Sequence, residues 1–455
     1  MLADVCEEFR HVIMKEDSFD PLHFFTISML SYSSALKWPN ATIGLIQEEE
    51  IYRDVERCKR GGYSFVNKHW CVANNPYVGR SNSTNASDDV YLGNIDANNL
   101  YGNALRYPLP VGDFKYLDKA AYSTIDWLHI DTKGDVGYFV VCDLHYPPSI
   151  HHATQNLPLA PELADITYDD FSPYMKEMFV RRNLSRNPEC KNPEKYNTVA
   201  KLLATCRDKK EYVVHFLVLQ LYLQLGMKIS RIYRVIQFKQ APIFKNYNDF
   251  NTSRRSAAVN DFEKDMYKQK NCSLFGKSLE NKRNRCDVVL CNSHNKMINV
   301  ASDHRFKQAR IFDANFAAAC LTKCNVELDS PIAIGASVLD ISKYIMYKLA
   351  YIQLPRYEKM FDCRIEIVGG DTDSFFIEVK GVDMISVLYP QMAADGLLDT
   401  SNYPHTHSMF SNVHKAELDC IKDEFAGMPY KEFILLRPKA YSMLPASSEV
   451  TASKR

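Results

Sequence analysis

Two aspartates, Asp371 and Asp373, flank one threonine in a segment whose pattern predicts a β-hairpin. Residues 364–379 are mostly apolar on either side of this tip, and Gly369 and Gly370 permit the positive φ angles that a tight hairpin turn favours. Side chains at positions i and i+2 of an extended backbone lie on the same face. Two carboxylates on one face repel each other unless a cation lies between them, and Mg²⁺ takes oxygen ligands. The spacing therefore predicts a divalent-metal site, although aspartates are also common in turns that bind nothing.

A third carboxylate, Asp96, follows the apolar segment of residues 90–95, which predicts a buried strand. If this strand lies beside the hairpin, Asp96 completes a two-metal site. In such sites two ions, about 3.5–4 Å apart, bind the attacking and leaving oxygens of phosphoryl transfer. The alternative for Asp96 alone is a helix N-cap, because aspartate is common at that position.

A basic segment, residues 252–271, predicts a polar helix. Lys264 and Lys268 are one turn apart in it and therefore share a face. Arg254 and Arg255 lie at its start. This face could bind a triphosphate, whereas the alternative is a charged helix that is merely solvated.

The charge of the chain is strongly segregated, although the 455 residues carry 55 basic and 55 acidic side chains and hence no net charge. Residues 176–310 hold 28 Lys and Arg against 12 Asp and Glu, which leaves 27 against 43 elsewhere. Such an excess favours a polyanionic partner, a nucleic acid or a nucleotide phosphate, over ordinary surface scatter. The composition, with 46% hydrophobic residues, excludes a disordered or collagen-like chain, and the length suits two or three domains.

The cysteine pattern and the absence of targeting signals predict an intracellular soluble protein that does not enter a membrane. The 13 cysteines form no C-x-x-C pair, which indicates free thiols in a reducing compartment. The longest apolar run, residues 213–225, is too short for a membrane span and is interrupted by polar residues. The first residues lack the basic start and apolar core of a signal peptide.

The remaining elements are predicted from hydrophobic periodicity and from turn residues. Residues 137–144 predict a strand, and residues 79–89 predict a polar linker. Residues 151–196, with five prolines, are expected to be irregular. Helices are expected in residues 1–56, 207–225, 306–324 and 337–351.

Four segments resemble the motifs of family B DNA polymerases, in the order that the family has them. Asp96-Ala-Asn-Asn-Leu-Tyr101-Gly102 resembles motif A (D-x-x-S-L-Y-P), and Lys268-Gln-Lys-Asn-Cys-Ser-Leu-Phe275-Gly276 resembles motif B (K-x-x-x-N-S-x-Y-G). Gly369-Gly-Asp371-Thr-Asp373-Ser374 resembles motif C (Y-G-D-T-D-S), and Pro438-Lys439-Ala-Tyr441 resembles the K-x-Y motif. The resemblance extends over residues 55–445 and is greatest to the protein-primed subgroup of viral, organellar and virus-derived enzymes.

The resemblance implies roles for the residues of motifs A and C. Asp96 and Asp373, helped by the carbonyl of Ala97, would bind two Mg²⁺ ions. Asp371 would support this catalytic site more than bind metal. Tyr101 would be the steric gate, whose ring occupies the space that a ribose 2′-hydroxyl needs.

The resemblance also implies a nucleotide-binding surface on the motif B helix. Lys268, with Lys264 and Arg255, would neutralise the phosphate charge that grows on the leaving pyrophosphate. Phe275 would pack near the nascent base pair.

Contacts to DNA are implied for two further segments. Lys439 and Tyr441 would hold the primer strand. The segment Lys59-Arg60-Gly61-Gly62 resembles the Y-x-G-G segment that binds the template, although a lysine replaces the tyrosine. Arg60, Gly61 and Gly62 are therefore expected to contact DNA, since glycines let the backbone approach phosphate.

The chain departs from the family pattern at five motif positions. Cys272 replaces the asparagine of motif B, which bears on nucleotide selection, and Phe275 replaces its tyrosine. Gly369 replaces the aromatic residue of motif C. In motif A, Asn99 replaces serine and Gly102 replaces proline.

The expected fold class is α+β, a right-hand polymerase palm built on an antiparallel sheet with helices, together with helical fingers. The resemblance implies that residues 1–85 are the end of an exonuclease domain and a connection, and that residues 86–200 are the first part of the palm with an insertion. Residues 201–285 would be the fingers, and residues 286–360 an inserted region and palm helices. Residues 361–441 would be the second part of the palm, and residues 442–455 a truncated thumb. On this division we expect no 3′–5′ exonuclease activity.

The function that this resemblance predicts is DNA-directed DNA polymerisation in DNA replication, with Mg²⁺, a primed DNA template and dNTPs, and with a terminal priming protein as a further partner. An alternative is a non-catalytic, DNA-binding remnant of a viral or transposon polymerase. A nucleotide-sugar transferase would explain Asp371 and Asp373 but none of the other motifs.

Overall fold

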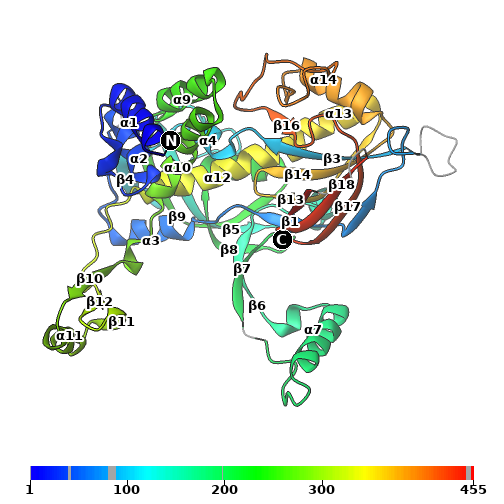
Figure 1. The fold of residues 1–455 in the computed structure, drawn as a ribbon. Helices are drawn as coiled ribbons and strands as arrows, with labels where there is room; N and C mark the ends of the chain where they lie inside the picture. The colour runs from blue at the N-terminus through cyan, green and yellow to red at the C-terminus, as the bar shows by residue number, and fades with distance from the viewer. Residues whose placement is uncertain (1, 39–41, 80–88, 197, 447–451, 455) are drawn as a thin grey trace.

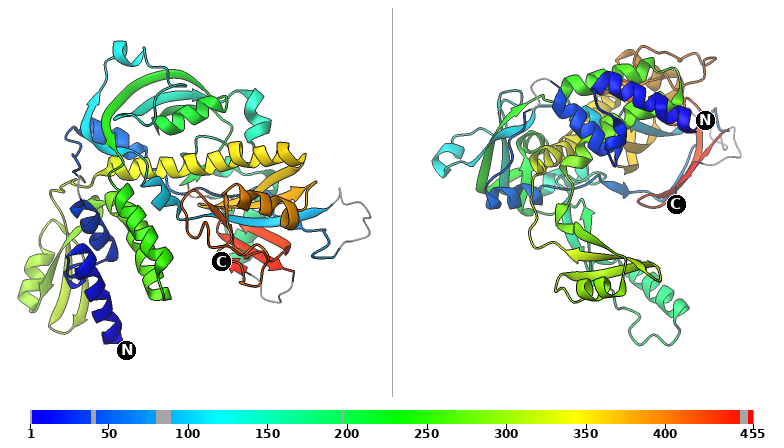
Figure 2. Two further views of the ribbon diagram at one scale, coloured as in Figure 1. Left: turned by 90° about the horizontal axis from the view of Figure 1, so that it is seen from above. Right: turned by 60° about the vertical axis from the view of Figure 1, so that its left-hand side comes forward.

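The computed structural model describes residues 2–38, 42–79, 89–196, 198–446 and 452–454 (Figure 1). Nearly all of the linker that the sequence predicts at residues 79–89 lies outside the described residues. Across the described part of the chain, no helix is both long enough and apolar enough to cross a membrane. Two sheets enclose a long central helix, a third sheet packs against the first, and two small units project from them (Figures 1 and 2).

A six-stranded sheet lies at the centre and brings together strands from distant parts of the chain. Its order is β1 (Ser64–Val66), β13 (Arg364–Asp371), β14 (Ser374–Lys380), β3 (Val90–Ala97), β16 (Ile421–Asp423) and β15 (Leu398–Asp399). All neighbours are antiparallel except β15 and β16. The predicted strand at residues 90–95 and the predicted hairpin at residues 364–379 are both confirmed. They pair with each other, so that Ser374 lies opposite Asp96.

The hairpin turn differs from the prediction in its position. Gly369 and Gly370 are part of β13, and the turn residue with a positive φ is Thr372, at 67°. The glycines are needed for close packing instead: a Cβ atom at Gly370 would lie 2.8 Å from a ring carbon of Phe65. The sequence pattern was correct about the hairpin but wrong about what its glycines do.

Helix α12 (Ile332–Lys348) lies between the six-stranded sheet and a second sheet, and nearly all its residues are buried (Figure 2). It confirms the helix predicted at residues 337–351. A π-helical turn, Leu349–Gln353, joins it to α13 (Leu354–Phe361). Because α12 is packed on both sides, it joins the two sheets into one core.

The second sheet has the order β4 (Leu109–Tyr116), β9 (Lys228–Ala241), β5 (Val136–His145) and β8 (Lys209–His215). Strand β5 confirms the strand predicted at residues 137–144. The helix predicted at residues 207–225 is wrong in its first half, which is β8, and only α8 (Phe216–Gln224) is helical. The apolar residues before α8 pair with β5, as Val214 does with Val140, and this long-range pairing overrides the local pattern.

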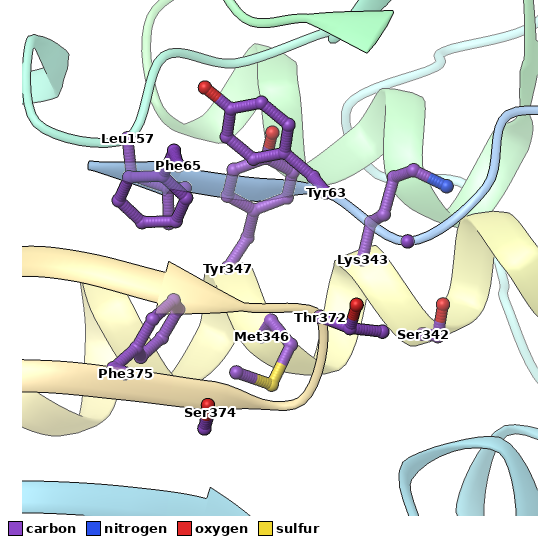
Figure 3. Close-up of a pocket in the computed structure, with 11 residues that line it drawn as sticks. Tyr63, Phe65, Leu157, Ser342, Lys343, Met346, Tyr347, Thr372, Ser374 and Phe375 are labelled. Carbon is purple, nitrogen blue, oxygen red and sulfur yellow. The ribbon is translucent and has the colours of Figure 1, made fainter. Parts of the chain in front are cut away.

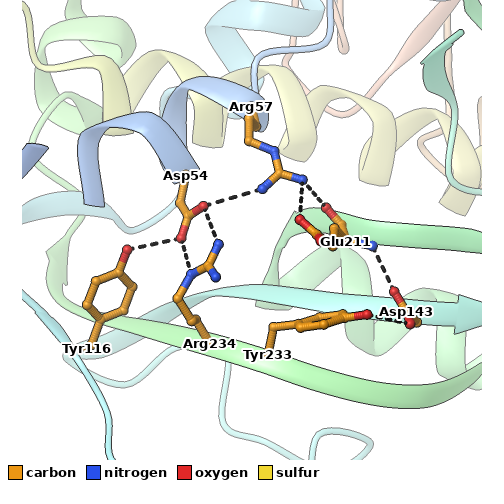
Figure 4. Close-up of polar contacts among 7 residues, drawn as sticks. All are labelled: Asp54, Arg57, Tyr116, Asp143, Glu211, Tyr233 and Arg234. Carbon is orange, nitrogen blue, oxygen red and sulfur yellow. Dashed lines mark hydrogen bonds and ion pairs between the residues drawn. The ribbon is translucent and has the colours of Figure 1, made fainter. Parts of the chain in front are cut away.

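A network of polar side chains fastens α3 (Glu49–Arg57) to the second sheet (Figure 4). The carboxylate of Asp54 accepts two hydrogen bonds from Arg234, at 2.7 and 2.8 Å, and one from the Tyr116 hydroxyl at 3.0 Å. Arg57 lies 3.5 Å from the same carboxylate and also contacts Glu211. The segment that follows α3 is therefore held in place before it enters β1.

Four helices form a bundle beside the sheets: α1 (Leu2–Asp17), α2 (Ile27–Lys37), α9 (Lys245–Ala257) and α10 (Asp261–Ser278). The single helix predicted at residues 252–271 is thus two helices. The break falls at Asn260, whose side chain caps α10 by accepting a hydrogen bond from the Glu263 backbone. Buried Lys270 donates to Asp17, 2.9 Å away, and ties α10 to α1. The helices predicted in residues 1–56 are confirmed as α1, α2 and α3.

Two units project from this core (Figure 1). The first comprises β6 (Glu162–Ile166), α7 (Pro173–Arg186) and β7 (Val199–Leu203), so residues 151–196 are more regular than expected. The second comprises β10 (Cys286–Cys291), α11 (His294–Ala301), β11 (Phe306–Asp313) and β12 (Phe316–Thr322). The helix predicted at residues 306–324 is therefore wrong. Every second residue of β12 is buried, which is the period of a strand.

A third sheet, with the order β19 (Ala452–Lys454), β18 (Ala440–Pro445), β17 (Tyr430–Arg437) and β2 (Trp70–Val72), packs its apolar side chains against β14 and β3. The short helices are α4 (Leu100–Ala104), α5 (Lys119–Tyr122), α6 (His151–Thr154) and α14 (Tyr389–Ala394). The division into palm, fingers, inserted region and thumb stays a prediction.

Candidate active site

Asp96 and Asp373 lie together where β3 meets the tip of the hairpin. The backbone N–H of Ala97 donates to the Asp373 carbonyl, 2.7 Å away, and so holds the turn against the end of β3. Burial raises the pKa of Asp96 to about 7, and the charge of Asp373 adds to this shift. Burial also raises the pKa of Asp373. Two adjacent carboxylates with raised pKa values gain from a divalent cation, and their oxygen-only donor set fits Mg²⁺.

Asp371 faces away from this pair, contrary to the same-face geometry that an extended backbone would give. The chain turns at Thr372, and the Asp373 N–H donates back to the Asp371 carbonyl at 2.8 Å. The buried Asp371 carboxylate accepts a hydrogen bond from the Ser64 hydroxyl, at 2.8 Å, and pairs with Lys439. Asp371 therefore joins the hairpin to β1 and to the β17–β18 turn.

Lys422 and Glu424 are site residues that the sequence analysis missed. Lys422 is opposite Asp96 in the β3–β16 pair, and its ammonium lies 3.2 Å from the Asp96 carboxylate and 3.0 Å from that of Glu424. The charge of Glu424 contributes to the raised pKa values of both Asp96 and Asp373. The only local signal is the run Lys-Asp-Glu after an apolar residue, which is common on surfaces. The pairing with β3 that gives it meaning cannot be predicted from that run.

Tyr101 lies in the first turn of α4, directly after Asp96 and the loop that follows it. Asn99 caps this helix from a left-handed conformation, with φ 45°, and its side chain accepts from the Gly102 N–H at 3.2 Å. The Tyr101 ring stacks on Phe275 of α10, with centroids 4.2 Å apart. Burial and then the charge of Asp373 raise the pKa of Tyr101 to about 12. The predicted gate and the motif B aromatic residue are thus brought together beside the carboxylates.

Cys272 connects α10 to the same place. Its thiol donates to the Asn99 side-chain oxygen, 3.3 Å away. Burial raises the pKa of Cys272, and the charge of Asp373 raises it further, whereas Lys268 and Arg255 oppose the shift. Lys268 of α10 and Arg255 of α9 are therefore close enough to the thiol, as Asp373 is, for their charges to act on it.

Lys264 lies one turn farther from the carboxylates than Lys268. It is exposed and pairs with Asp261 of its own helix at 3.3 Å. Lys268 is also exposed, and Arg255 is half-buried. Of the three predicted phosphate-binding side chains, the structure brings Lys268 and Arg255 to the site, and Lys264 remains at its edge.

The predicted template segment divides into two parts with different environments. Gly62 packs on the hairpin turn so closely that a Cβ atom there would lie 2.5 Å from the Thr372 methyl group. Gly61 is exposed and has open space around it. Arg60, however, is only 5% exposed: it lies over the Tyr212 ring, 3.9 Å away, and 3.7 Å from Asp340. A direct contact between the Arg60 side chain and DNA is therefore contradicted by its burial.

Lys439 and Tyr441 lie on the β17–β18 hairpin. Lys439 occupies its turn, with φ 61°, and its exposed ammonium pairs with Asp371. Tyr441 is half-buried, with its ring edge against Phe376 at 4.9 Å. The structure thus connects both residues to the β13–β14 hairpin, Lys439 through an ion pair and Tyr441 through a ring contact.

A cavity lies behind the turn, between β1, the β13–β14 hairpin and α12 (Figure 3). Its walls include Tyr63, Phe65, Tyr347 and Phe375, and the first two rings stack at 5.0 Å. Lys343 also lines the cavity, but its ammonium donates to the backbone carbonyls of residues 60 and 339. The lining is mainly apolar, which suits support of the hairpin from behind better than chemistry.

The arrangement defines a right-hand polymerase fold of the α+β class, as comparison with solved structures shows. The chain is similar to Phi29 DNA polymerase in its orthorhombic crystal form, with 13% identity, a TM-score of 0.52, and coverage of 95% of this chain and 57% of that one. It is similar to the ternary complex of that polymerase with primer–template DNA and incoming nucleotides, at 14% identity, TM-score 0.52, and coverage of 98% and 62%. The chain thus spans about three fifths of these structures. No family model and no curated protein sequence matches it.

Proposed function

We propose that this chain is a DNA-directed DNA polymerase, which adds deoxynucleotides to a primer 3′-hydroxyl by a two-metal mechanism. The observation that carries the proposal is the meeting of Asp96 and Asp373 beside Tyr101 and Cys272. These residues come from three separate motifs and are brought together only by the fold. The fold similarity supports the same class of activity.

In this proposal Asp96 and Asp373, with the carbonyl of Ala97, hold two Mg²⁺ ions. Such ions activate the attacking hydroxyl and stabilise the leaving oxygen. Asp371 orients the hairpin through Ser64 and Lys439 and leaves metal binding to the other two carboxylates.

The nucleotide is bound between α4 and α10 in this proposal. Lys268 and Arg255, with Lys264 at the edge, neutralise the triphosphate, since their charges act on the thiol on which the charge of Asp373 also acts. Tyr101 excludes the 2′-hydroxyl of a ribonucleotide. Its ring is held by the stack on Phe275, so it cannot swing aside freely.

DNA is proposed to lie along the β17–β18 turn and the segment before β1. Lys439 and Tyr441 would hold the primer, and the backbone at Gly61 and Gly62 would approach the template. Support comes from the similar solved structures of Phi29 DNA polymerase, which include complexes with primer–template DNA and with single-stranded DNA. The excess of basic residues in 176–310 supplies the positive field that such binding needs. A protein-primed mode, with a terminal priming protein as partner, remains part of this proposal.

Primer extension on a primed single-stranded template, with Mg²⁺ and dNTPs, tests the proposal. We expect extension by the wild type and none by Asp373→Ala. Asp371→Asn is the matched comparison: it removes a charge from the same turn and should slow extension without abolishing it. No extension by the wild type, with intact folding by circular dichroism, would refute the proposal.

One observation favours the alternative, a DNA-binding protein without turnover. The Lys422 ammonium neutralises Asp96, one of the two proposed metal-binding carboxylates. In that case the chain should bind primed DNA in a gel shift, with an affinity that falls steeply with salt because phosphate contacts release counterions. Extension would then be absent with Mn²⁺ as well as with Mg²⁺.

A further inference from the structure

A second cluster of metal-binding side chains lies in the long irregular segment between β15 and β16, residues 400–420. His414, Glu417 and Cys420 each offer one donor atom, and these atoms lie within 4.8 Å of one another. The residues are three apart along the chain, and the segment between β15 and β16 is built of turns and bends. This cluster is separate from the carboxylates of the proposed active site.

The donor set indicates which class of metal it would bind. An imidazole, a thiol and a carboxylate together suit Zn²⁺ and similar transition metals, whereas Mg²⁺ prefers oxygen ligands alone. Zinc lies about 2.3 Å from sulfur and about 2.1 Å from nitrogen, and in a tetrahedral site two such ligands are about 3.6 Å apart. Rotation of the half-buried His414 and the exposed Glu417 side chains can close the remaining difference of about 1 Å.

The electrostatic surroundings also favour a cation. The carboxylates of Glu417, Asp399 and Asp419 act electrostatically on the buried Cys420 thiol. The thiol donates to the Gly396 carbonyl, 3.3 Å away, and the His414 ring is 2.6 Å from the Glu417 carboxylate. A divalent cation offsets this local negative charge and takes the place of the thiol proton, which is released to solvent.

The segment that carries the cluster is attached to the loop after Asp96. The Asn98 backbone N–H donates to the Cys420 carbonyl at 2.9 Å, and the Asn98 side chain donates to the Glu417 carbonyl at 3.1 Å. Ala416 and Asp419 have positive φ angles, 57° and 77°, which non-glycine residues adopt only at a cost. A metal ion that crosslinks the segment would stabilise this backbone.

We propose that His414, Glu417 and Cys420 bind one zinc-class metal ion, with water as the fourth ligand. The ion would fix the segment of residues 400–420 against the loop after β3 and so help to hold β16, with Lys422, beside Asp96. This proposal does not depend on the proposed polymerase activity, since the site would bind metal whether or not the chain extends a primer.

Titration of the metal-free full chain with Co²⁺ tests the proposal, because a cobalt–thiolate bond gives a charge-transfer absorption band. We expect one Co²⁺ per chain, a band that Cys420→Ser abolishes, and displacement by Zn²⁺. Cys320→Ser is the matched control. The Cys320 thiol is hydrogen-bonded to Cys286 in the projecting unit of β10 and β12, and this pair of thiols is an alternative binding site for Co²⁺. A band that survives in Cys420→Ser, or that is lost in Cys320→Ser, would overturn the proposal.

His414→Asn removes a proposed ligand but keeps the buried Cys420 thiol. It therefore tests the site even if the Cys420→Ser variant does not fold. We expect this substitution to weaken metal binding by about tenfold or more, as loss of a ligand does. Hydrogen exchange provides a second readout: Zn²⁺ should slow exchange in residues 400–420 of the wild type and not in His414→Asn. Equal protection in both proteins would contradict the assigned ligands.

Discussion

The thiol of Cys272 donates a hydrogen bond to the side-chain oxygen of Asn99, 3.3 Å away, and so joins α10 to the turn before α4. Both residues depart from the family B motifs, where a serine stands in motif A and an asparagine in motif B. In this chain the amide belongs to Asn99 of the motif A segment, and the smaller group, the thiol, belongs to Cys272 of the motif B segment. Two departures that looked independent in the sequence are one exchanged pair in the structure.

This pair should behave as a coupled unit. Asn99→Ser and Cys272→Asn should each destabilise the fold, because each leaves a mismatched partner in a largely buried contact. The double variant should recover part of the loss, with a coupling of about 0.5–3 kcal/mol. Denaturant unfolding of the four proteins measures this coupling, and simple additivity of the two single effects would show that the contact is incidental.

Tyr101 should control the choice of sugar. Tyr101→Val removes the ring that stacks on Phe275 and should raise ribonucleotide incorporation. Tyr101→Phe keeps the stacked ring and should keep the discrimination. The measurement is the ratio of kcat/KM for a dNTP to that for the matching rNTP, and an unchanged ratio in Tyr101→Val would remove this residue from the gate.

Lys422 should compete with metal ions for Asp96. Lys422→Met removes the ammonium that lies 3.2 Å from that carboxylate, so Mn²⁺ should bind more tightly to the chain without DNA. An ion pair of this partly exposed kind contributes about 1 kcal/mol, which corresponds to roughly fivefold in affinity. Calorimetric titration with Mn²⁺ measures the change. Lys380→Met is the control, since the Lys380 ammonium lies 2.7 Å from the carboxylate of Glu378, and this ion pair is outside the site. Equal affinities in Lys422→Met and Lys380→Met would contradict the competition.

The fold should lose stability in mild acid because of His215. Burial lowers the pKa of this side chain from 6.5 to about 4, although the charge of Asp340 partly opposes the shift. In that window the imidazole is protonated in the unfolded chain and not in the folded one, so the contribution of His215 to the free energy of unfolding should fall as the pH falls from 6.5 to about 4. The slope should be up to about 1.4 kcal/mol per pH unit.

Denaturant midpoints between pH 7 and pH 4 measure this effect. His215→Leu keeps an apolar side chain among Phe139, Phe216 and Phe238 and removes the titrating group. Its midpoints should be less sensitive to pH in this range than those of the wild type. Identical pH profiles would show that other groups cause the acid sensitivity.

The sequence was sufficient to predict the strand that carries Asp96 and the two strands of the hairpin, because their apolar runs end at charged residues. It was not sufficient where distant pairing decides the structure. Residues 306–324 have an alanine-rich pattern that a helix would also suit, and it is pairing with β10 and β11 that makes β12 a strand. The local signal at Lys422 is too common to single this residue out, since its importance depends on β16 lying beside β3. Arg60 was expected to contact DNA because its segment resembles a template-binding motif, but its side chain is buried, and Asp340 and the Tyr212 ring compensate its charge there.

The contact between Gly62 and Thr372 constrains how this protein can change. A Cβ atom at position 62 would overlap the threonine methyl group, so substitution at position 62 requires a smaller residue at position 372 in the same step. In any library of variants, the two positions must therefore be randomised together. A change at position 62 alone would displace the turn that presents Asp373, and the cost would appear in the chemistry even though Gly62 is not one of the proposed metal-binding residues.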